Sequence, residues 1–390
     1  MPEATERSEP TVASADKGKA PAAEGITNTA NEPAPEPHAK VAAGHESRED
    51  APPAAAADGG GVVTVASDDV LQPDTEVEED DVFDDGDSAF ASLHSSTTSL
   101  RDELILQVRE HGRSYQGYLE AKYVLPMDEQ ELERLDFQCH LVWLTLDKKH
   151  STAPIGKITR ALDVGCGTGL WAIEFADEHP EAEVLGVDLA PVQPQCVPPN
   201  LLFEVDDLEQ PWNFTQRFDY IHCQLMVGAF QDWPKFFRQS LEYLAPGGYT
   251  EVKEIDFVIR CDDGTMAPDS AIARWHDLMH EAARKAGFPL DTISQVPEMM
   301  RDAGYTDIVA RQVKWPINTW PRDPKHKELG QWAHENFSWG CESMSLALFT
   351  RVLGWSSDEV RVFMALVRKD LKDRRIHAYW NFWIVYGRKG

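Results

Sequence analysis

The feature that most constrains the fold is a short apolar run that ends in three closely spaced glycines. The run LDVGCGTG occupies residues 162–169, and LWAIEFADEHP, a pattern that favours a helix closed by Pro180, follows it. Glycine adopts backbone angles that other residues resist, and it lets the main chain approach a ligand closely. A strand that enters such a turn and a helix that leaves it are typical of a βαβ unit that binds a nucleotide-like ligand.

Strand and helix patterns alternate after this turn, which predicts an α/β fold with a parallel sheet and helices on both faces. Strands are expected at 161–164, 183–190, 201–208, 218–225, 247–255 and 306–317, with a β-prone run at 376–389. Helices are expected at 233–246, 270–287, 292–304 with an interruption at Pro297, and within 325–372. We expect seven strands, with a C-terminal hairpin supplying the antiparallel strand.

Two further helices are expected before the glycine turn. Residues 100–110 carry apolar side chains at helical spacing, and residues 128–146 form an amphipathic pattern. Asp128 is the expected N-cap of the second helix. Glu131 follows it by three residues, as in a capping box.

The first hundred residues differ in composition from the rest. They hold 22 acidic residues against 5 basic ones and only two aromatics, Phe83 and Phe90, while all 12 tryptophans and all 6 cysteines follow. Such a segment buries too little apolar surface to offset the entropy of ordering. We therefore expect residues 1–99 to be a disordered acidic tail with a Ser/Thr-rich linker. Its run 68–87, with 11 acids and no base, is either a solvated tail or a docking segment for a basic partner.

Charge and composition disfavour several classes of protein. The net charge of −29 argues against direct binding of nucleic acid through phosphate contacts. No run of about 18 apolar residues occurs, so we expect no membrane span. The cysteines form no CxxC pair and are expected to be free thiols. His276 and His280 are four residues apart on a predicted helix, but no glutamate follows His276 as in HExxH, so no metal site is expected.

Acidic residues at fixed places around the turn sharpen the identity of the ligand. Asp163 precedes the first glycine by two residues, the glycine spacing is GxGxG, and no Lys-Ser/Thr follows, which excludes a P-loop. Asp188 ends the second strand, where an acid can accept hydrogen bonds from both ribose hydroxyls. Asp206-Asp207 ends the third strand, and LAPGG precedes the fifth. This combination resembles the class I S-adenosylmethionine (SAM) methyltransferases.

The resemblance implies a Rossmann-like sheet of seven strands with SAM as the cofactor. It implies a lead at 100–158, a cofactor-binding core at 159–258 and a substrate-binding roof at 259–390. The cofactor-binding residues expected from it are Asp163, Gly165, Cys166, Gly167, Gly169, Asp188, Leu189, Asp206 and Asp207.

Aromatic residues of the lead are further candidates, because aromatic rings can face a sulfonium cation. Tyr115 is taken as a cofactor-binding residue, and Tyr118 and Tyr123 are similar candidates; ordinary core packing is the alternative for each. Arg113 either meets the cofactor carboxylate or forms a surface salt bridge.

A narrower resemblance covers nearly all of 107–390. Its motifs are GRSY (112–115), YVLPMDE (123–129), ERLD (133–136), FEVDD (203–207) with Pro211-Trp212, RVLGW (351–355) and HAYW (377–380). They resemble the LaeA-like fungal methyltransferases. That family implies regulation of development or secondary metabolism, velvet-type or zinc-finger partners, and a location in nucleus and cytoplasm. Three functions stay open: methylation of a protein or of itself, methylation of a small metabolite in a biosynthetic pathway, and a SAM-binding scaffold.

Catalytic candidates lie at the carboxyl ends of the strands, where open α/β sheets place ligands. Positioning supplies much of the acceleration in methyl transfer, and a general base is needed only if the acceptor loses a proton. We take His222 and Glu254 as catalytic candidates, with a hydrogen-bonding wall residue as the alternative for His222. Trp332, Phe337 and Trp339 either roof the acceptor pocket or belong to the core.

Overall fold

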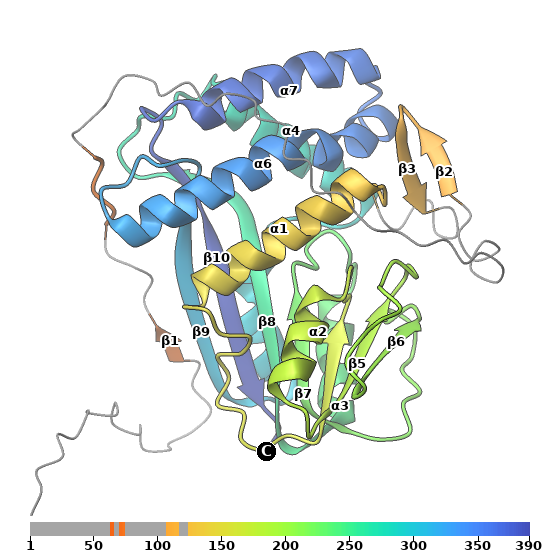
Figure 1. Cartoon of the computed structure of the whole chain (residues 1–390). Helices are drawn as coiled ribbons and strands as arrows, with labels where there is room; N and C mark the ends of the chain where they lie inside the picture. The colour runs from red at the N-terminus through yellow and green to blue at the C-terminus, as the bar shows by residue number, and fades with distance from the viewer. Residues whose placement is uncertain (1–62, 66–69, 75–106, 117–123) are drawn as a thin grey trace, which may run out of the picture. The chain divides into compact units, whose positions relative to one another are not determined.

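The strands around the glycine turn form a mixed sheet at the centre of the fold (Figure 1). The computed structural model describes residues 63–65, 70–74, 107–116 and 124–390, which all lie in the unit Ala57–Gly390. Within them the sheet has the order β1-β9-β10-β8-β7-β4-β5-β6. The parallel strands are β4 (Arg160–Val164), β5 (Glu183–Asp188), β6 (Leu201–Val205), β7 (Phe218–Gln224) and β8 (Leu244–Cys261).

The last two strands close the sheet on the side of β8. β9 (Thr306–Pro316) and β10 (Ala378–Arg388) lie side by side, and β10 pairs antiparallel with both β8 and β9. The seven expected strands, with an antiparallel C-terminal strand, are therefore confirmed, and β1 (Val63–Val65) adds an eighth strand. The expected hairpin is wrong, because two helices separate β9 from β10 along the chain.

Helices cover both faces of the sheet and the carboxyl ends of its strands. α2 (Leu170–Glu178) packs on the face of β4 that carries Ala161, and α3 (Trp233–Tyr243) with α5 (Val296–Ala303) packs on the opposite face, which carries Leu162. The remaining helices lie over the strand ends in Figure 1: α1 (Glu129–Thr145), α4 (Ala271–Ala286), α6 (Pro324–Arg351) and α7 (Ser357–Lys372).

Two helix predictions need correction. Residues 107–110 are not helical but form β2 (Gln107–Glu110), which pairs with β3 (Arg113–Gln116), while residues 100–106 lie outside the described part. His111 and Gly112 between them both have positive φ, as the tight turn of a two-residue hairpin requires. Pro297 does not interrupt α5, because it lies in its first turn, where a proline removes no helical hydrogen bond.

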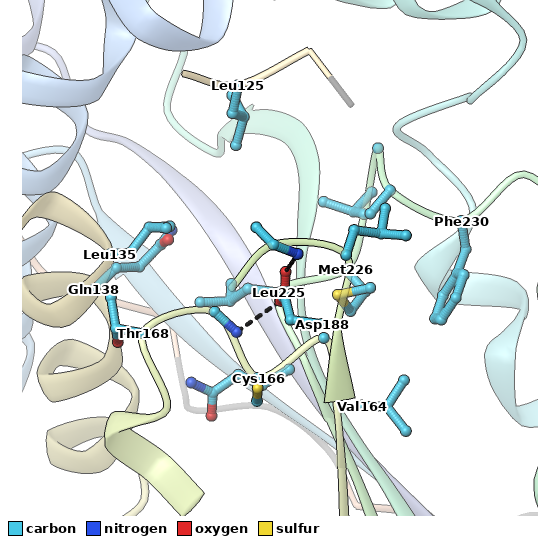
Figure 2. A pocket seen from close by; sticks show the side chains of 18 of the residues that line it. Leu125, Leu135, Gln138, Val164, Cys166, Thr168, Asp188, Leu225, Met226 and Phe230 are labelled. Atoms are coloured by element: carbon cyan, nitrogen blue, oxygen red, sulfur yellow. Dashed lines mark hydrogen bonds between the residues drawn. The ribbon is translucent and has the colours of Figure 1, made fainter. Parts of the chain in front are cut away.

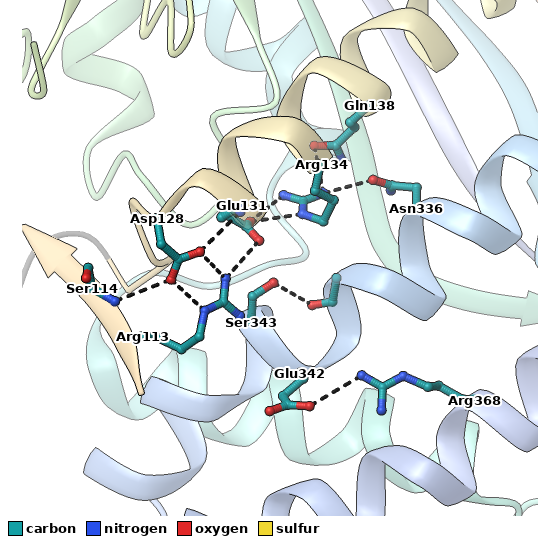
Figure 3. Close-up of polar contacts among 11 residues, drawn as sticks. Arg113, Ser114, Asp128, Glu131, Arg134, Gln138, Asn336, Glu342, Ser343 and Arg368 are labelled. Atoms are coloured by element: carbon teal, nitrogen blue, oxygen red, sulfur yellow. Dashed lines mark hydrogen bonds and ion pairs between the residues drawn. The ribbon is translucent and has the colours of Figure 1, made fainter. Parts of the chain in front are cut away.

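The start of α1 is fixed by charged side chains rather than by a full capping box (Figure 3). Asp128 is the N-cap and accepts a hydrogen bond from the Glu131 amide, as predicted. The reciprocal half is replaced: the Glu131 carboxylate accepts from Arg134, at 2.9 and 2.7 Å. The Arg134 guanidinium also donates to Asn336 at 2.8 Å, which ties α1 to α6.

Part of the expected tail packs on the body of the protein. β1 (Val63–Val65) adds to the free edge of β9 in parallel register. Farther on, the Asp74 amide donates to the carbonyl of Trp320, and the Asp74 carboxylate pairs with Lys327. The boundary expected at residue 99 is therefore wrong for these two segments; the rest of 1–106 lies outside the described residues.

None of the helices in the described ranges is long and apolar enough to cross a membrane.

Candidate functional site

The glycine turn between β4 and α2 has the conformation that its sequence predicts. Gly165, Gly167 and Gly169 have φ of 66°, 55° and 84°, a region that residues with a Cβ enter only at a cost. A Cβ at Gly165 would lie 2.2 Å from the Met226 sulfur, and one at Gly169 would lie 2.3 Å from the Phe203 ring. A Cβ at Gly167 would meet nothing within 4 Å. The Phe203 ring thus leaves no room for a Cβ at Gly169, the flexible end of Met226 fills the space beside Gly165, and Gly167 leaves open space.

Asp188, at the end of β5, holds this turn in place. Its carboxylate accepts hydrogen bonds from the Gly167 amide at 2.8 Å and from the Ala190 amide at 3.0 Å. Burial raises the pKa of Asp188, and these backbone donors oppose the rise. A carboxylate has about four acceptor positions, so Asp188 can still accept from a ligand hydroxyl.

A cavity of about 240 Å³ opens beside the turn (Figure 2). Its turn end is lined by Asp163, Gly165, Cys166, Gly167, Asp188, Leu189, Asp206 and Asp207. Its helix end is lined by Phe257, Met279, Phe288, Leu290, Phe337, Met344 and Leu348. Residues 124–127 and the side chains of Leu135 and Gln138 from α1 line it as well. The turn end is polar and the helix end is apolar.

Asp206 and Asp207 shape the rim of the turn end. The Asp206 amide donates to the Asp188 carbonyl at 3.1 Å, and the Asp206 carboxylate accepts from the Asp207 amide at 2.8 Å. Asp207 in turn accepts from the Glu209 amide at 3.0 Å. Hydrogen bonds with nearby backbone groups therefore hold both acids at the carboxyl end of β6.

Asp163 and His222 form a fully buried pair beneath the turn. The Nδ1 atom of His222 lies 2.7 Å from Oδ1 of Asp163, and the imidazole stacks on Trp171 with 3.6 Å between ring centroids. Burial raises the pKa of Asp163 to about 8 and holds the pKa of His222 well below its ordinary value. The Lys253 ammonium, itself buried, adds to the lowering at His222.

Glu254 is buried within β8, one residue past the last pair with β7, beside the loop that follows β7. One carboxylate oxygen accepts from the Val227 amide at 2.7 Å and the other from the Ile255 amide at 2.8 Å. Burial nevertheless raises the pKa of Glu254 to about 8. Its neighbour Asp256, by contrast, pairs with Arg260 at 2.9 Å and does not line the cavity.

A family model and several curated proteins match this chain. A family model described as a methyltransferase domain matches residues 129–310. The chain is 38% identical over 307 residues to methyltransferase pytC of Aspergillus terreus, covering 78% of this chain and 95% of that protein. It is 37% identical to the secondary metabolism regulator LAE1 of Cochliobolus heterostrophus, covering 72% of this chain and 94% of that protein. It is also 37% identical to the protein-methionine methyltransferase laeA of Emericella nidulans, covering 72% and 76%.

The chain belongs to the LaeA-like methyltransferases. It is a SAM-dependent methyltransferase, and the turn end of its cavity fits that cofactor. The open space at Gly167 lets a ligand approach the backbone, and Asp188 and Asp206 offer acceptors for hydroxyl and amino groups. When bound, the cofactor supplies an electrophilic methyl group on a sulfonium.

The LaeA-like lead places two predicted residues away from the cavity. Tyr115 does not line it, because β3 turns this ring into the core, where the Arg351 guanidinium lies 4.8 Å from the ring centroid. The prediction that Tyr115 binds the cofactor is therefore wrong. Arg113 binds Asp128 at 2.6 and 2.7 Å and so takes the salt-bridge alternative (Figure 3). Tyr118 and Tyr123 lie outside the described residues.

The roof of this LaeA-like protein was only partly predicted. Phe337 lines the cavity, whereas Trp332 and Trp339 pack against Phe137 of α1 instead. The sequence reasoning missed Met279, Phe288 and Met344, which α4, the segment after it and α6 bring to the helix end. Their helical spacing does not distinguish a cavity wall from an ordinary core position.

Proposed function

We propose that this methyltransferase transfers its methyl group to a neutral thioether, the side chain of a methionine in a partner protein or in itself. The observation that carries the proposal is the apolar helix end of the cavity. The charged groups that line the cavity near it are already engaged: Arg134 by Glu131 and Asn336, and Glu254 by two backbone amides. An acceptor that must be ionised would meet no free counter-charge from these groups.

A thioether fits because its attack releases no proton. The acceptor sulfur forms a bond to the methyl carbon as the bond from that carbon to the cofactor sulfur breaks. The positive charge passes from one sulfonium to the other, so no base is required. The protein's contribution is to exclude water and align the two sulfurs. The aromatic rings of Phe257 and Phe337, which line this apolar space, can stabilise a cation.

The protonation of Glu254 supports the same reading. Its pKa of about 8 keeps the carboxyl mostly protonated at neutral pH. It therefore holds the loop at Val227 without adding a full negative charge to the cavity. In this proposal Glu254 is a positioning residue and not a base.

The names of the relatives support two acceptor classes. The laeA protein of Emericella nidulans is named a protein-methionine methyltransferase, which favours the thioether. The pytC protein is named a methyltransferase only and matches over nearly its whole length, so a small apolar metabolite of a biosynthetic pathway is the second candidate. A neutral metabolite of modest size would occupy the same helix end.

The acceptor class can be tested with SAM carrying a CD₃ group. The purified protein is incubated alone and with a fungal nuclear extract, digested, and searched for methionines that gain CD₃. Transfer to methionine supports the proposal. Transfer to lysine, arginine or another nucleophile, with none to methionine, contradicts it. A gene deletion that accumulates one unmethylated metabolite, without broad loss of other products, supports the second candidate instead.

The proposal includes a regulatory setting in nucleus and cytoplasm, with velvet-type or zinc-finger partners. The 11 acids of 68–87 support a basic partner. Affinity capture from the fungus, with the full chain and with a variant lacking residues 1–60, should recover the same partners. Loss of partners in that variant would assign docking to the first 60 residues instead of the acidic run.

A further inference from the structure

The Asp163–His222 pair has the composition of a general-base dyad, but its place in the sheet is wrong for one. In the parallel register, His222 of β7 lies level with Asp163 of β4 and with Glu251 of β8. The strand continues for two residues beyond His222, to Gln224. His222 is therefore inside the sheet, below the glycine turn. The helix end of the cavity is formed by residues that lie past the strand ends, such as Met279 and Phe337.

The imidazole is also held in one orientation. It stacks on Trp171 with an interplanar angle of 14°, and the indole nitrogen of Trp171 donates to the His150 carbonyl at 3.0 Å. The same carbonyl accepts from the Lys253 ammonium at 2.5 Å. A ring fixed from one face in this way cannot swing toward an acceptor without breaking the Trp171 contact.

The second nitrogen of His222 is buried beneath the glycine turn. Its Nε2 atom is buried and has no hydrogen-bond partner among the described residues. A general base must come within hydrogen-bond reach of the proton that it removes. His222 lines the cavity at the level of Asp163, inside the sheet, and not at the helix end, where the acceptor is expected. The Nδ1 atom, by contrast, is engaged with Asp163.

The arrangement fixes the orientation of the Asp163 carboxyl. His222 engages only Oδ1, so Oδ2 remains available to a donor in the cavity, which Asp163 lines at its turn end. An unfixed carboxyl in this buried place would rotate between several acceptors and lose part of its binding energy to ordering.

We infer that His222 is a positioning residue for cofactor binding, which fixes the Asp163 carboxyl toward a cationic amino group at the turn end, and not a base in methyl transfer. The inference concerns the cofactor that the family uses. It does not depend on which acceptor the helix end receives.

Two substitutions separate hydrogen bonding from ring stacking. His222→Asn keeps an amide donor near the place of Nδ1, whereas His222→Phe keeps a ring against Trp171 and removes the hydrogen bond. The probe is S-adenosylhomocysteine, whose binding needs no acceptor, measured by calorimetry on the full chain. His222→Phe should weaken binding about tenfold or more, because the hydrogen bond that orients the Asp163 carboxyl is lost. His222→Asn should recover most of that loss.

Two results would overturn the inference. One is wild-type affinity in His222→Phe. The other is normal affinity in His222→Asn together with a kcat that falls about 100-fold, as expected for removal of a base. Thermal melts check folding. If His222→Phe does not fold, Asp163→Asn replaces it, and binding unchanged in that variant also refutes the inference. Failure of the thioether proposal would change the labelled residue in the CD₃ experiment but not these affinities.

Discussion

At the turn end of the cavity the key contacts come from the backbone of the glycine turn and the carboxylate that holds it, whereas at the helix end they come from side chains of separate helices. The amide of Gly167 and the carboxylate of Asp188 define the first. Met279 from α4 and Phe337 from α6 define the second, and Phe337 comes 58 positions after Met279 in the sequence. Backbone geometry leaves a strong trace in sequence, because few residues but glycine tolerate it. The apolar residues of a cavity wall cannot be told from ordinary core residues in the sequence.

The strongest test of this contrast is Gly167→Arg. The substitution forces a side chain onto a residue with φ of 55° and directs it into open cavity space. We expect binding of S-adenosylhomocysteine to be lost, with Kd raised at least about 100-fold, since both strain and steric exclusion oppose it. Calorimetry measures the effect. Gly156→Arg is a matched control, since Gly156 also has open space around it but is exposed and lies outside the cavity lining.

Unchanged binding in Gly167→Arg would remove the basis for placing the cofactor at the turn end. The same variant separates enzyme from scaffold in the fungus. A phenotype like that of a gene deletion, with normal protein levels, excludes the scaffold function. A wild-type phenotype supports it.

The contrast between the two ends also explains what sequence reasoning could reach. The glycines, Asp188 and the alternating strands were predictable because each depends on local backbone chemistry. Tyr115 was misplaced because an aromatic residue suits a core and a binding site equally well. The β2–β3 hairpin was missed because apolar spacing was weighted above the His111-Gly112 turn signal. The three-residue strand β1 was missed because its pairing depends on the neighbouring edge of β9 more than on its own sequence.

The second prediction concerns the pH dependence of the protein's stability that is due to Glu254, a residue that lines the cavity. Glu254 has a folded-state pKa of about 8 against an ordinary value of 4.5. Its contribution to stability is therefore fully present below pH 4.5 and is lost as pH rises through about 8. The loss is on the order of 5 kcal/mol, at about 1.4 kcal/mol per pKa unit. Glu254→Gln removes the titration. The free energy of unfolding of this variant minus that of the wild type should therefore increase between pH 5 and pH 9.

Denaturant unfolding at several pH values measures this difference. Glu298→Gln is a suitable control, because the Glu298 side chain is exposed to solvent. A stability difference between Glu254→Gln and the wild type that does not change with pH would show that Glu254 is ionised throughout, and would remove one support from the neutral-acceptor proposal.

The third prediction separates the ends by their ligands. Phe337→Leu keeps an apolar side chain but removes the ring face from the helix end. We expect kcat/KM for the acceptor to fall about tenfold, in line with the 1–3 kcal/mol that a hydrophobic pocket commonly contributes to discrimination. Kd for S-adenosylhomocysteine should stay within about twofold of wild type. Trp339→Leu is the control, because Trp339 is partly exposed and does not line the cavity. Equal loss of cofactor affinity in Phe337→Leu would mean that the two ends are not independent.

The smallest effect is expected from Asp74→Asn. This variant tests whether a small loss of overall stability, without any change in the cavity, alters cofactor or acceptor binding. Asp74 pairs with Lys327 at the start of α6, and its side chain is 16% exposed. A partly exposed ion pair contributes about 1 kcal/mol or less, so the midpoint of denaturant unfolding should fall slightly. Neither cofactor Kd nor acceptor kcat/KM should change, because Asp74 lines neither end of the cavity. A parallel change in both would mean that general loosening of the fold, rather than the local contacts at Gly167 or Phe337, explains the larger effects. If cofactor Kd and acceptor kcat/KM are both unchanged, the larger effects of the Gly167 and Phe337 variants come from local contacts at the two ends of the cavity.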